Sequence, residues 1–103
     1  MERITLVCSA GMSTSLLVAK MNAAAIKKGI NVKIIAVAEA ELKNHIDNTD
    51  VLLLGPQVKF LLSKYKAAYE PKGIPVDVIN SLDYGLMNGE KVLEQALNLI
   101  NKK

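Results

Sequence analysis

One short segment near the N-terminus combines a nucleophile with residues that can surround an anion. It runs from Cys8 to Ser15, reads CSAGMSTS, and has small side chains apart from Met12. Small side chains let a backbone curl so that several N–H groups point inward and form an anion-binding nest. A helix that starts directly afterwards adds unpaired N–H groups and the positive end of its dipole. The segment therefore predicts a phosphate-binding loop.

Cys8 enters this segment from an apolar run, so its sulfur is expected beside the phosphorus atom of a bound phosphate. Amide groups and a helix N-terminus favour the thiolate, which is the nucleophile for phosphoryl capture. The same donors would stabilise the equatorial oxygens during transfer. Two plainer interpretations compete. A lone cysteine at the end of a core strand is most often a small hydrophobic residue, and helix capping accounts for Ser13 or Thr14 without a ligand. The polar segment after Cys8 favours the nucleophile.

The sequence lacks the residues that several other kinds of site would need. It contains no Gly-Lys-Ser/Thr phosphate loop, no Gly-x-Gly-x-x-Gly after a strand, and no metal-ligand spacing of cysteine or histidine. We therefore expect no metal and no cofactor. A phosphate-receiver domain needs an Asp at the carboxyl end of its third strand, where Leu54 and Gly55 stand. A flavin site needs aromatic residues around the ring, and the loops supply only Tyr84.

Apolar runs and helical patterns alternate along the chain. Strands are predicted at residues 4–7, 32–37, 51–54 and 75–79, and helices at 13–28, 39–45, 57–69 and 87–101. This alternation predicts a parallel sheet with helices on both faces. We expect an α/β fold: a small three-layer, doubly wound, flavodoxin-like sheet of about four parallel strands in the order 2-1-3-4.

Sheets of this kind bind ligands beyond the carboxyl ends of their strands. Three loops are expected there, at residues 8–15, 55–57 and 80–85. The second and third of these loops contain Gln57, Asp83 and Tyr84.

Length and composition restrict the class of protein. A chain of 103 residues predicts a single domain over 1–103, and its 4% aromatic content predicts an aliphatic core. The net charge of +3, carried on scattered lysines, argues against a nucleic-acid partner. The single cysteine cannot form an internal disulfide, and the apolar run at 4–7 is too short for a signal peptide or a membrane span. We expect a cytoplasmic protein.

The segments CSAGMSTS, DVLLLGPQ and SLDYG together resemble the enzyme IIB component of the lactose, cellobiose and chitobiose branch of the bacterial phosphotransferase system. The resemblance extends from Ile4 to the last helix. It implies that a phosphohistidine on the IIA partner gives its phosphoryl group to Cys8. Phosphocysteine then gives it to a cellobiose-, chitobiose- or lactose-type disaccharide held by the membrane component IIC.

The resemblance also assigns roles to single residues. Cys8 matches the phosphocysteine nucleophile, and Gln57 and Tyr84 match positions on neighbouring loops. The phosphate-binding loop of the family is matched by Ser9, Ala10, Gly11, Met12, Ser13, Thr14 and Ser15. The protein is expected to reach the membrane through IIC and to be a monomer when isolated. Because the sugar contacts are expected on IIC, this chain does not specify the sugar.

Two other functions fit parts of the pattern. Low-molecular-weight tyrosine phosphatases have a similar loop on a similar sheet, with Cys, five residues, Arg, and then Ser or Thr. Here Thr14 stands in place of that Arg, Arg3 precedes the core of the first strand, and Asp83 is the candidate general acid. The missing arginine fork favours a relay over a hydrolase. A simple anion-binding module would leave Cys8 idle, so alkylation of Cys8 without loss of function would favour that alternative.

Overall fold

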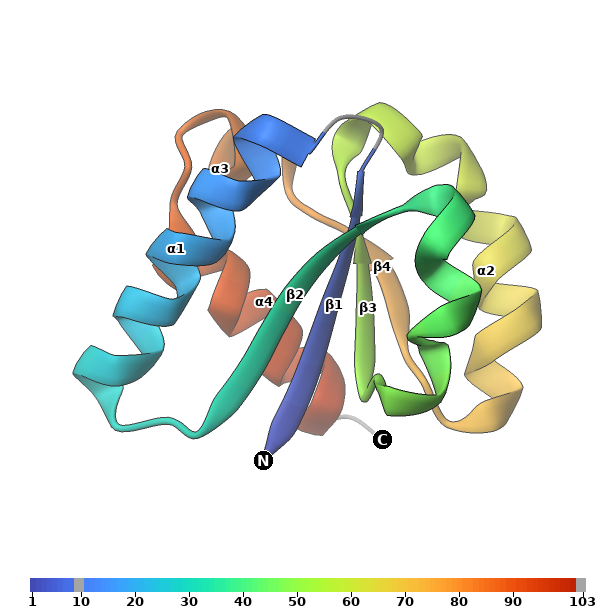
Figure 1. The fold of residues 1–103 in the computed structure, drawn as a ribbon, viewed down its shortest axis with the longest axis horizontal. Helices are drawn as coiled ribbons and strands as arrows, with labels where there is room; N and C mark the ends of the chain where they lie inside the picture. Colours follow the sequence, from blue (N-terminus) through green and yellow to red (C-terminus); the bar gives the residue numbers. More distant parts are fainter. Residues whose placement is uncertain (9–10, 102–103) are drawn as a thin grey trace.

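In the part of the chain that the computed structural model describes, residues 1–8 and 11–101 with the backbone alone at 11–13, four parallel strands form one sheet. The strands are β1 (Glu2–Cys8), β2 (Val32–Ala38), β3 (Val51–Leu54) and β4 (Val76–Val78). Their order is β2-β1-β3-β4, which confirms the predicted order 2-1-3-4. The strands run in one direction, and their carboxyl ends lie at the top of Figure 1.

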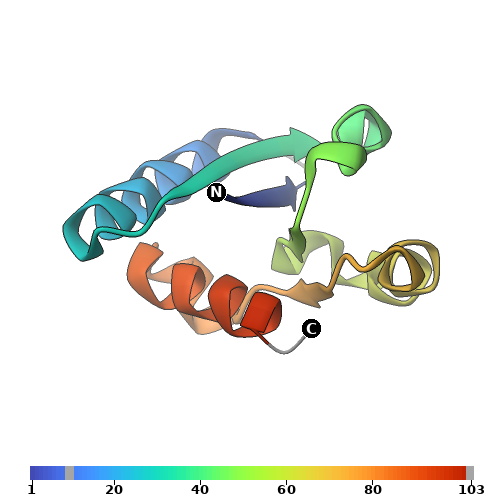
Figure 2. The same ribbon diagram turned by 90° about the horizontal axis from the view of Figure 1, so that it is seen from below.

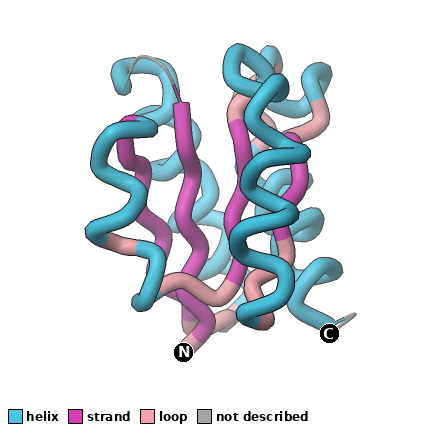
Figure 3. The backbone as a smooth tube through the Cα atoms, turned by 90° about the vertical axis from the view of Figure 1, so that its right-hand side faces the viewer, coloured by secondary structure: helices cyan, strands magenta, loops and turns pink. Residues whose placement is uncertain are grey.

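Helices cover both faces of this sheet. One face carries α1 (Gly11–Lys28), α3 (Ser81–Gly85) and α4 (Gly89–Asn101), and the opposite face carries α2 (Leu62–Tyr69) (Figure 2). Short 3-10 helices join the elements at η1 (Glu39–Asn44), η2 (Ile46–Asn48), η3 (Pro56–Leu61) and η4 (Glu70–Lys72). In Figure 3 the strands lie side by side between these helical layers. Within the described residues, no helix has the length and apolar character needed to cross a bilayer.

The alternation of side chains along β1 separates two cores. Ile4 and Leu6 pack with α1 and α4, while Val7 packs with α2 on the other face. The β3 residues Val51–Leu54 are fully buried, as predicted for a strand covered on both faces. Burying each such side chain contributes about 1.5–3 kcal/mol, so this short strand anchors both cores.

Most predicted elements differ from the structure by one or two residues at their ends, the predicted helix at 39–45 is the 3-10 helix η1, and three differences bear on the site. The first helix begins at Gly11, so Thr14 lies inside its first turn and does not cap it. The predicted helix at 57–69 is divided into η3 and α2, with non-helical backbone at Val58 (φ −117°, ψ 24°). The expected loop at 80–85 contains α3, because the Asn80 side chain accepts hydrogen bonds from the amides of Leu82 and Asp83 and caps a helix there.

Candidate active site

The carboxyl ends of three strands are joined by backbone hydrogen bonds beside Cys8. The Gly55 amide donates to the Val7 carbonyl at 2.8 Å, and the Ile79 amide donates to the Leu54 carbonyl at 2.8 Å. The ends of β1, β3 and β4 therefore lie in register along one edge of the sheet. The loops that follow these strands begin from this edge.

Cys8 is the last residue of β1, and its side chain is only 3% exposed. By alternation it points to the same face as Ile4 and Leu6, which is the face that α1 covers. The first turn of α1 carries no acidic residue. The positive end of the helix is therefore not neutralised within that turn, which suits an anion.

The predicted phosphate-binding loop is partly helical. Ser9 and Ala10 lie outside the described residues, and Gly11 to Ser15 form the start of α1. Thr14 is buried at 1% exposure, whereas Ser15 is exposed on the helix. A phosphate here would therefore meet the first turn of a helix directly after β1.

Gln57 folds back over Gly55 toward Cys8. A Cβ atom added to Gly55 would lie 2.5 Å from Gln57 Oε1 and 3.6 Å from Cys8 Cβ. Only a residue without a side chain allows the Gln57 amide to occupy this space. Gly55 thus brings the Gln57 side chain to the neighbourhood of Cys8.

Tyr84 of α3 links Gln57, from the segment after β3, to Thr14 in the first turn of α1. Gln57 Nε2 donates to Tyr84 Oη at 2.9 Å, and Tyr84 Oη and Thr14 Oγ1 are paired at 3.4 Å. Tyr84 is 9% exposed and belongs to the core cluster between the sheet and α1 and α4. The structure therefore brings together Thr14, Gln57 and Tyr84, which come from three separate segments of the chain.

Asp83 is not joined to this group by any hydrogen bond that the described residues provide. It is half-buried on α3, next to Tyr84, and its described contacts are made by its backbone. Successive residues of a helix point about 100° apart, so Asp83 and Tyr84 do not share a direction. The role of Asp83 as a general acid at Cys8 stays a prediction.

Among the described residues, the side chains brought together at this edge carry thiol, hydroxyl and amide groups. They comprise the Cys8 thiol, the Thr14 and Tyr84 hydroxyls and the Gln57 amide. With the N-terminus of α1, they can surround an anion through hydrogen-bond donors and a helix dipole. Cys8 supplies a nucleophile in the same place.

Comparison with known proteins decides the family. The model of the family described as "PTS system, Lactose/Cellobiose specific IIB subunit" matches residues 3–95. The chain belongs to this family. It is therefore a phosphotransferase component of a sugar-transporting phosphotransferase system, as the sequence resemblance predicted.

Curated relatives of this IIB chain carry names with different sugars. A galactose-specific EIIB component and a cellobiose-specific EIIB component, both of Lactococcus lactis, are each 48% identical over 95% of this chain and 95% of their own length. An oligo-beta-mannoside-specific EIIB component of Bacillus subtilis is 42% identical over 97% of both chains.

Solved structures confirm the fold class. The solution structure of a cellobiose-specific IIB component from Borrelia burgdorferi has a TM-score of 0.82 and 49% identity, over 99% of this chain and 94% of the other. A YwlE mutant from Bacillus subtilis has a TM-score of 0.62 and 18% identity, over all of both chains. This second likeness shows a common fold of the low-molecular-weight phosphatase type and nothing further.

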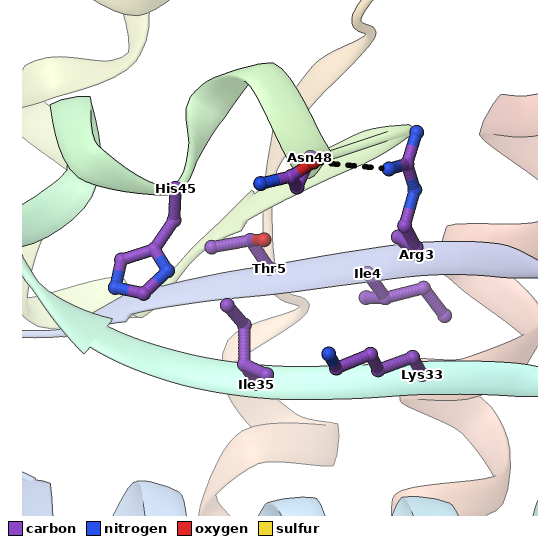
Figure 4. A pocket seen from close by; sticks show the side chains of 7 residues that line it. All are labelled: Arg3, Ile4, Thr5, Lys33, Ile35, His45 and Asn48. Carbon is purple, nitrogen blue, oxygen red and sulfur yellow. Dashed lines mark hydrogen bonds between the residues drawn. The ribbon is translucent and has the colours of Figure 1, made fainter.

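A cavity of about 170 Å³ lies elsewhere on the IIB chain (Figure 4). It is lined by Arg3, Ile4, Thr5, Lys33, Ile35, His45 and Asn48. Arg3 and Cys8 are five residues apart on β1, roughly 16 Å along a strand, so the cavity is separate from the Cys8 edge. Asp50 pairs with the Arg3 guanidinium at 3.2 Å, and Asn48 accepts from it at 3.4 Å.

His45 is one of the residues that line this cavity. It is half-buried at the junction of η1 and η2. Its backbone is held on both sides, because its amide donates to Leu42 and its carbonyl accepts from the Thr49 hydroxyl. These bonds fix the backbone of His45 at the cavity, away from the Cys8 edge.

Proposed function

We propose that this IIB chain carries a phosphoryl group on Cys8 between two partner proteins. The donor is the phosphohistidine of a IIA protein, and the acceptor is a hydroxyl of a disaccharide held by the membrane component IIC. The observation that supports this proposal most directly is the position of Cys8. A nucleophile ends β1, the N-terminus of α1 follows within three residues, and neutral hydrogen-bond donors lie beside it.

The two transfer steps balance without a cofactor. In the first step the bond between phosphorus and the histidine nitrogen breaks, a bond between phosphorus and Cys8 Sγ forms, and the thiol proton ends on the departing imidazole. In the second step the S–P bond breaks and a P–O bond forms with the sugar hydroxyl. The hydroxyl proton passes to a base on IIC, and Cys8 leaves as a thiolate, which takes up a proton from solvent to become the thiol of the first step again. The N-terminus of α1 stabilises the phosphoryl oxygens in both steps.

The partners follow from this cycle. Cys8 meets IIA and IIC in turn at the same edge of the sheet, and the protein reaches the membrane only through IIC. The relatives named for galactose, cellobiose and oligo-beta-mannoside are between 42% and 48% identical to this chain. Similar IIB chains thus serve different sugars, which fits sugar selection by IIC.

The intact mass of the protein tests this function. The chain is incubated with a phosphorylated IIA protein of a lactose/cellobiose-type system, and the galactose-specific relative of Lactococcus lactis serves as positive control. We expect the mass of one phosphoryl group on Cys8, which disappears when sugar and IIC membranes are added. If the relative is phosphorylated and this chain is not, the proposed function is wrong.

The phosphorylated chain is expected to decay slowly and to show negligible turnover of aryl phosphates. A phosphatase of this fold clamps the phosphoryl group with an arginine fork, and Thr14 occupies that position here. The hydrogen bonds described for Asp83 are made by its backbone, so none of them holds its carboxylate in place to activate water at Cys8. The measurement is a time course of phosphoprotein decay beside an aryl-phosphate assay.

The variant Thr14→Arg serves as the comparison in these two assays. An arginine that reaches the site would shorten the life of the phosphocysteine. Rapid turnover of aryl phosphates by the unmodified chain would contradict the proposed carrier function and favour a phosphatase.

A further inference from the structure

We propose that Gln57 and Tyr84 are positioning residues that hold the Thr14 hydroxyl, and with it the first turn of α1, against a phosphoryl group on Cys8. This inference rests on the proposed function and deepens it. The three side chains form a chain of uncharged hydrogen bonds that ends at the position where a phosphatase of this fold has its arginine. We refer to this chain, Gln57–Tyr84–Thr14, as the hydroxyl relay.

The first bond of the hydroxyl relay has a fixed direction. An amide nitrogen can only donate, so Gln57 Nε2 gives its proton to Tyr84 Oη at 2.9 Å. Tyr84 Oη and Thr14 Oγ1 lie 3.4 Å apart, and either hydroxyl can be the donor of this pair. When Tyr84 donates, the Thr14 proton is left to donate to a phosphoryl oxygen. In this arrangement the hydroxyl relay adds a donor at the Cys8 edge.

The 3.4 Å contact is longer than the usual 2.7–2.8 Å between hydroxyl oxygens. A bond of this length is weak, whereas a hydroxyl donating to an anionic oxygen forms a shorter and stronger bond. The relay is therefore expected to tighten when a phosphoryl group is present. Burial supports this, because Thr14 is 1% exposed and Tyr84 is 9% exposed, which restricts competition from water.

A second set of hydrogen bonds fixes the backbone around Tyr84. Its amide donates to the Asn80 carbonyl at 2.9 Å, and Asn80 caps α3. Gln95 of α4 accepts from the Asn80 amide at 3.2 Å and donates to the Val78 carbonyl at 2.7 Å. The end of β4 and the start of α3 are thus tied to α4. A hydroxyl carried on this support is preorganised, which is what stabilising a transferring group requires.

An uncharged relay also explains why phosphocysteine is held without hydrolysis. Hydroxyl and amide donors bind the phosphoryl oxygens but add no full positive charge to them. A guanidinium in the same place would stabilise the additional charge that builds up when water attacks. The hydroxyl relay therefore favours transfer of the phosphoryl group to an acceptor that a partner protein presents.

The variant Tyr84→Phe removes the hydroxyl and keeps the ring. We expect kcat for phosphoryl transfer from phosphorylated IIA to fall by roughly 10- to 100-fold, as for the loss of hydrogen bonds to a charged group. KM for IIA should stay within about twofold, because the docking surface is untouched. The melting midpoint should fall by less than about 8 °C, since Gln57 is exposed and can turn to water.

The control is Tyr65→Phe, which makes the same chemical change in the other core. Tyr65 is 5% exposed and packs on the α2 face. Burial, followed by the charges of Glu39 and Tyr69, raises the pKa of Tyr65, so its hydroxyl stays protonated. We expect unchanged kcat in this control. The double variant Tyr84→Phe with Gln57→Leu should lower kcat no further than Tyr84→Phe alone, because both residues act through one hydroxyl relay.

The outcomes separate this inference from the proposed function. If the unmodified chain accepts the phosphoryl group and folded Tyr84→Phe has the same kcat, the hydroxyl relay is overturned and the carrier function stands. If the unmodified chain accepts nothing while the Lactococcus relative does, the carrier function fails. A loss confined to the melting midpoint would reduce Tyr84 to a structural role and overturn the inference.

Gly55→Ala disturbs the hydroxyl relay without changing any of its three residues. This variant therefore tests the hydroxyl relay even if Tyr84→Phe does not fold. The new Cβ would lie 2.5 Å from Gln57 Oε1, which must move, but 3.4 Å from the Val7 carbonyl and 3.6 Å from Cys8 Cβ, which are ordinary contacts. We expect the fold to persist and kcat to fall by roughly 3- to 10-fold, as for one hydrogen bond. Gly85→Ala is the control, because nothing lies within 4 Å of its added Cβ. Equal kcat values in Gly55→Ala and Gly85→Ala would contradict the hydroxyl relay.

Discussion

Replacing Cys8 with serine is expected to abolish phosphoryl acceptance and to leave the fold intact. The side chain is 3% exposed at the end of β1, and oxygen in place of sulfur is a small change in volume. A serine hydroxyl ionises far less readily than a thiol, so at neutral pH it is a much poorer nucleophile. The loss should be roughly 10⁴-fold or more, as when a nucleophile is removed from an enzyme.

Intact mass after incubation with phosphorylated IIA measures this loss, and the melting midpoint reports the fold. Met21→Leu is a suitable control, because it changes a fully buried residue on the same face with little change in volume. It should accept the phosphoryl group at the normal rate. A phosphoryl mass on Cys8→Ser that passes on to sugar would show that another residue is the carrier.

The sheet could be predicted from the sequence because each strand has a strong local signature. Val51–Leu54 is a continuous apolar run, and its predicted bounds are those of β3. The carboxyl ends of parallel strands must meet at one edge, so the predicted order already brought Cys8 near the loops after β3 and β4. Local pattern and topology were sufficient for this part of the fold.

Short helices were harder to predict. Ser81–Gly85 has five residues, which is too few for a helical period to be seen, and it forms through the cap that Asn80 provides. The start of α1 at Gly11 was also missed. Preferences for capping residues favoured Ser13 and Thr14, but the buried Thr14 side chain is turned to Tyr84 instead.

The partners of the candidate site residues depend on contacts across the whole chain. Thr14 and Tyr84 are 70 residues apart, and Gln57 and Tyr84 are 27 apart. The sequence predicted that these residues lie at one edge of the sheet. That Gln57 and Tyr84 bond to one another, and that Asp83 does not join them, depends on how α3 packs on α4 and on the space that Gly55 leaves.

Gly89→Ala is expected to destabilise the protein strongly, although it adds only one methyl group. Gly89 is the buried first residue of α4, where α4 crosses α1. An added Cβ would lie 2.4 Å from the Lys20 carbonyl carbon and 2.5 Å from the Met21 amide nitrogen. These are backbone atoms of a long helix, so they cannot turn aside as a flexible side chain can. The two helices must separate.

That separation disturbs the core cluster between the sheet, α1 and α4, because Met21, Val92 and Leu93 belong to it and are almost fully buried. Overpacking of a core typically costs about 1–3 kcal/mol, and a clash with backbone belongs at or above the upper end. At about 4–8 °C per kcal/mol for a domain of this size, a cost of about 3 kcal/mol lowers the melting midpoint by roughly 12–24 °C.

Thermal and urea unfolding measure this effect, with Gly85→Ala as the matched control. Gly85 ends α3, has no neighbour within 4 Å of an added Cβ, and should tolerate alanine with a change within about 1 kcal/mol. Because Gly89 meets α1 at Lys20 and Met21, more than two turns beyond the start of that helix, the folded fraction of Gly89→Ala should still accept a phosphoryl group. A melting midpoint equal to that of Gly85→Ala would mean that α1 and α4 do not approach as closely as described.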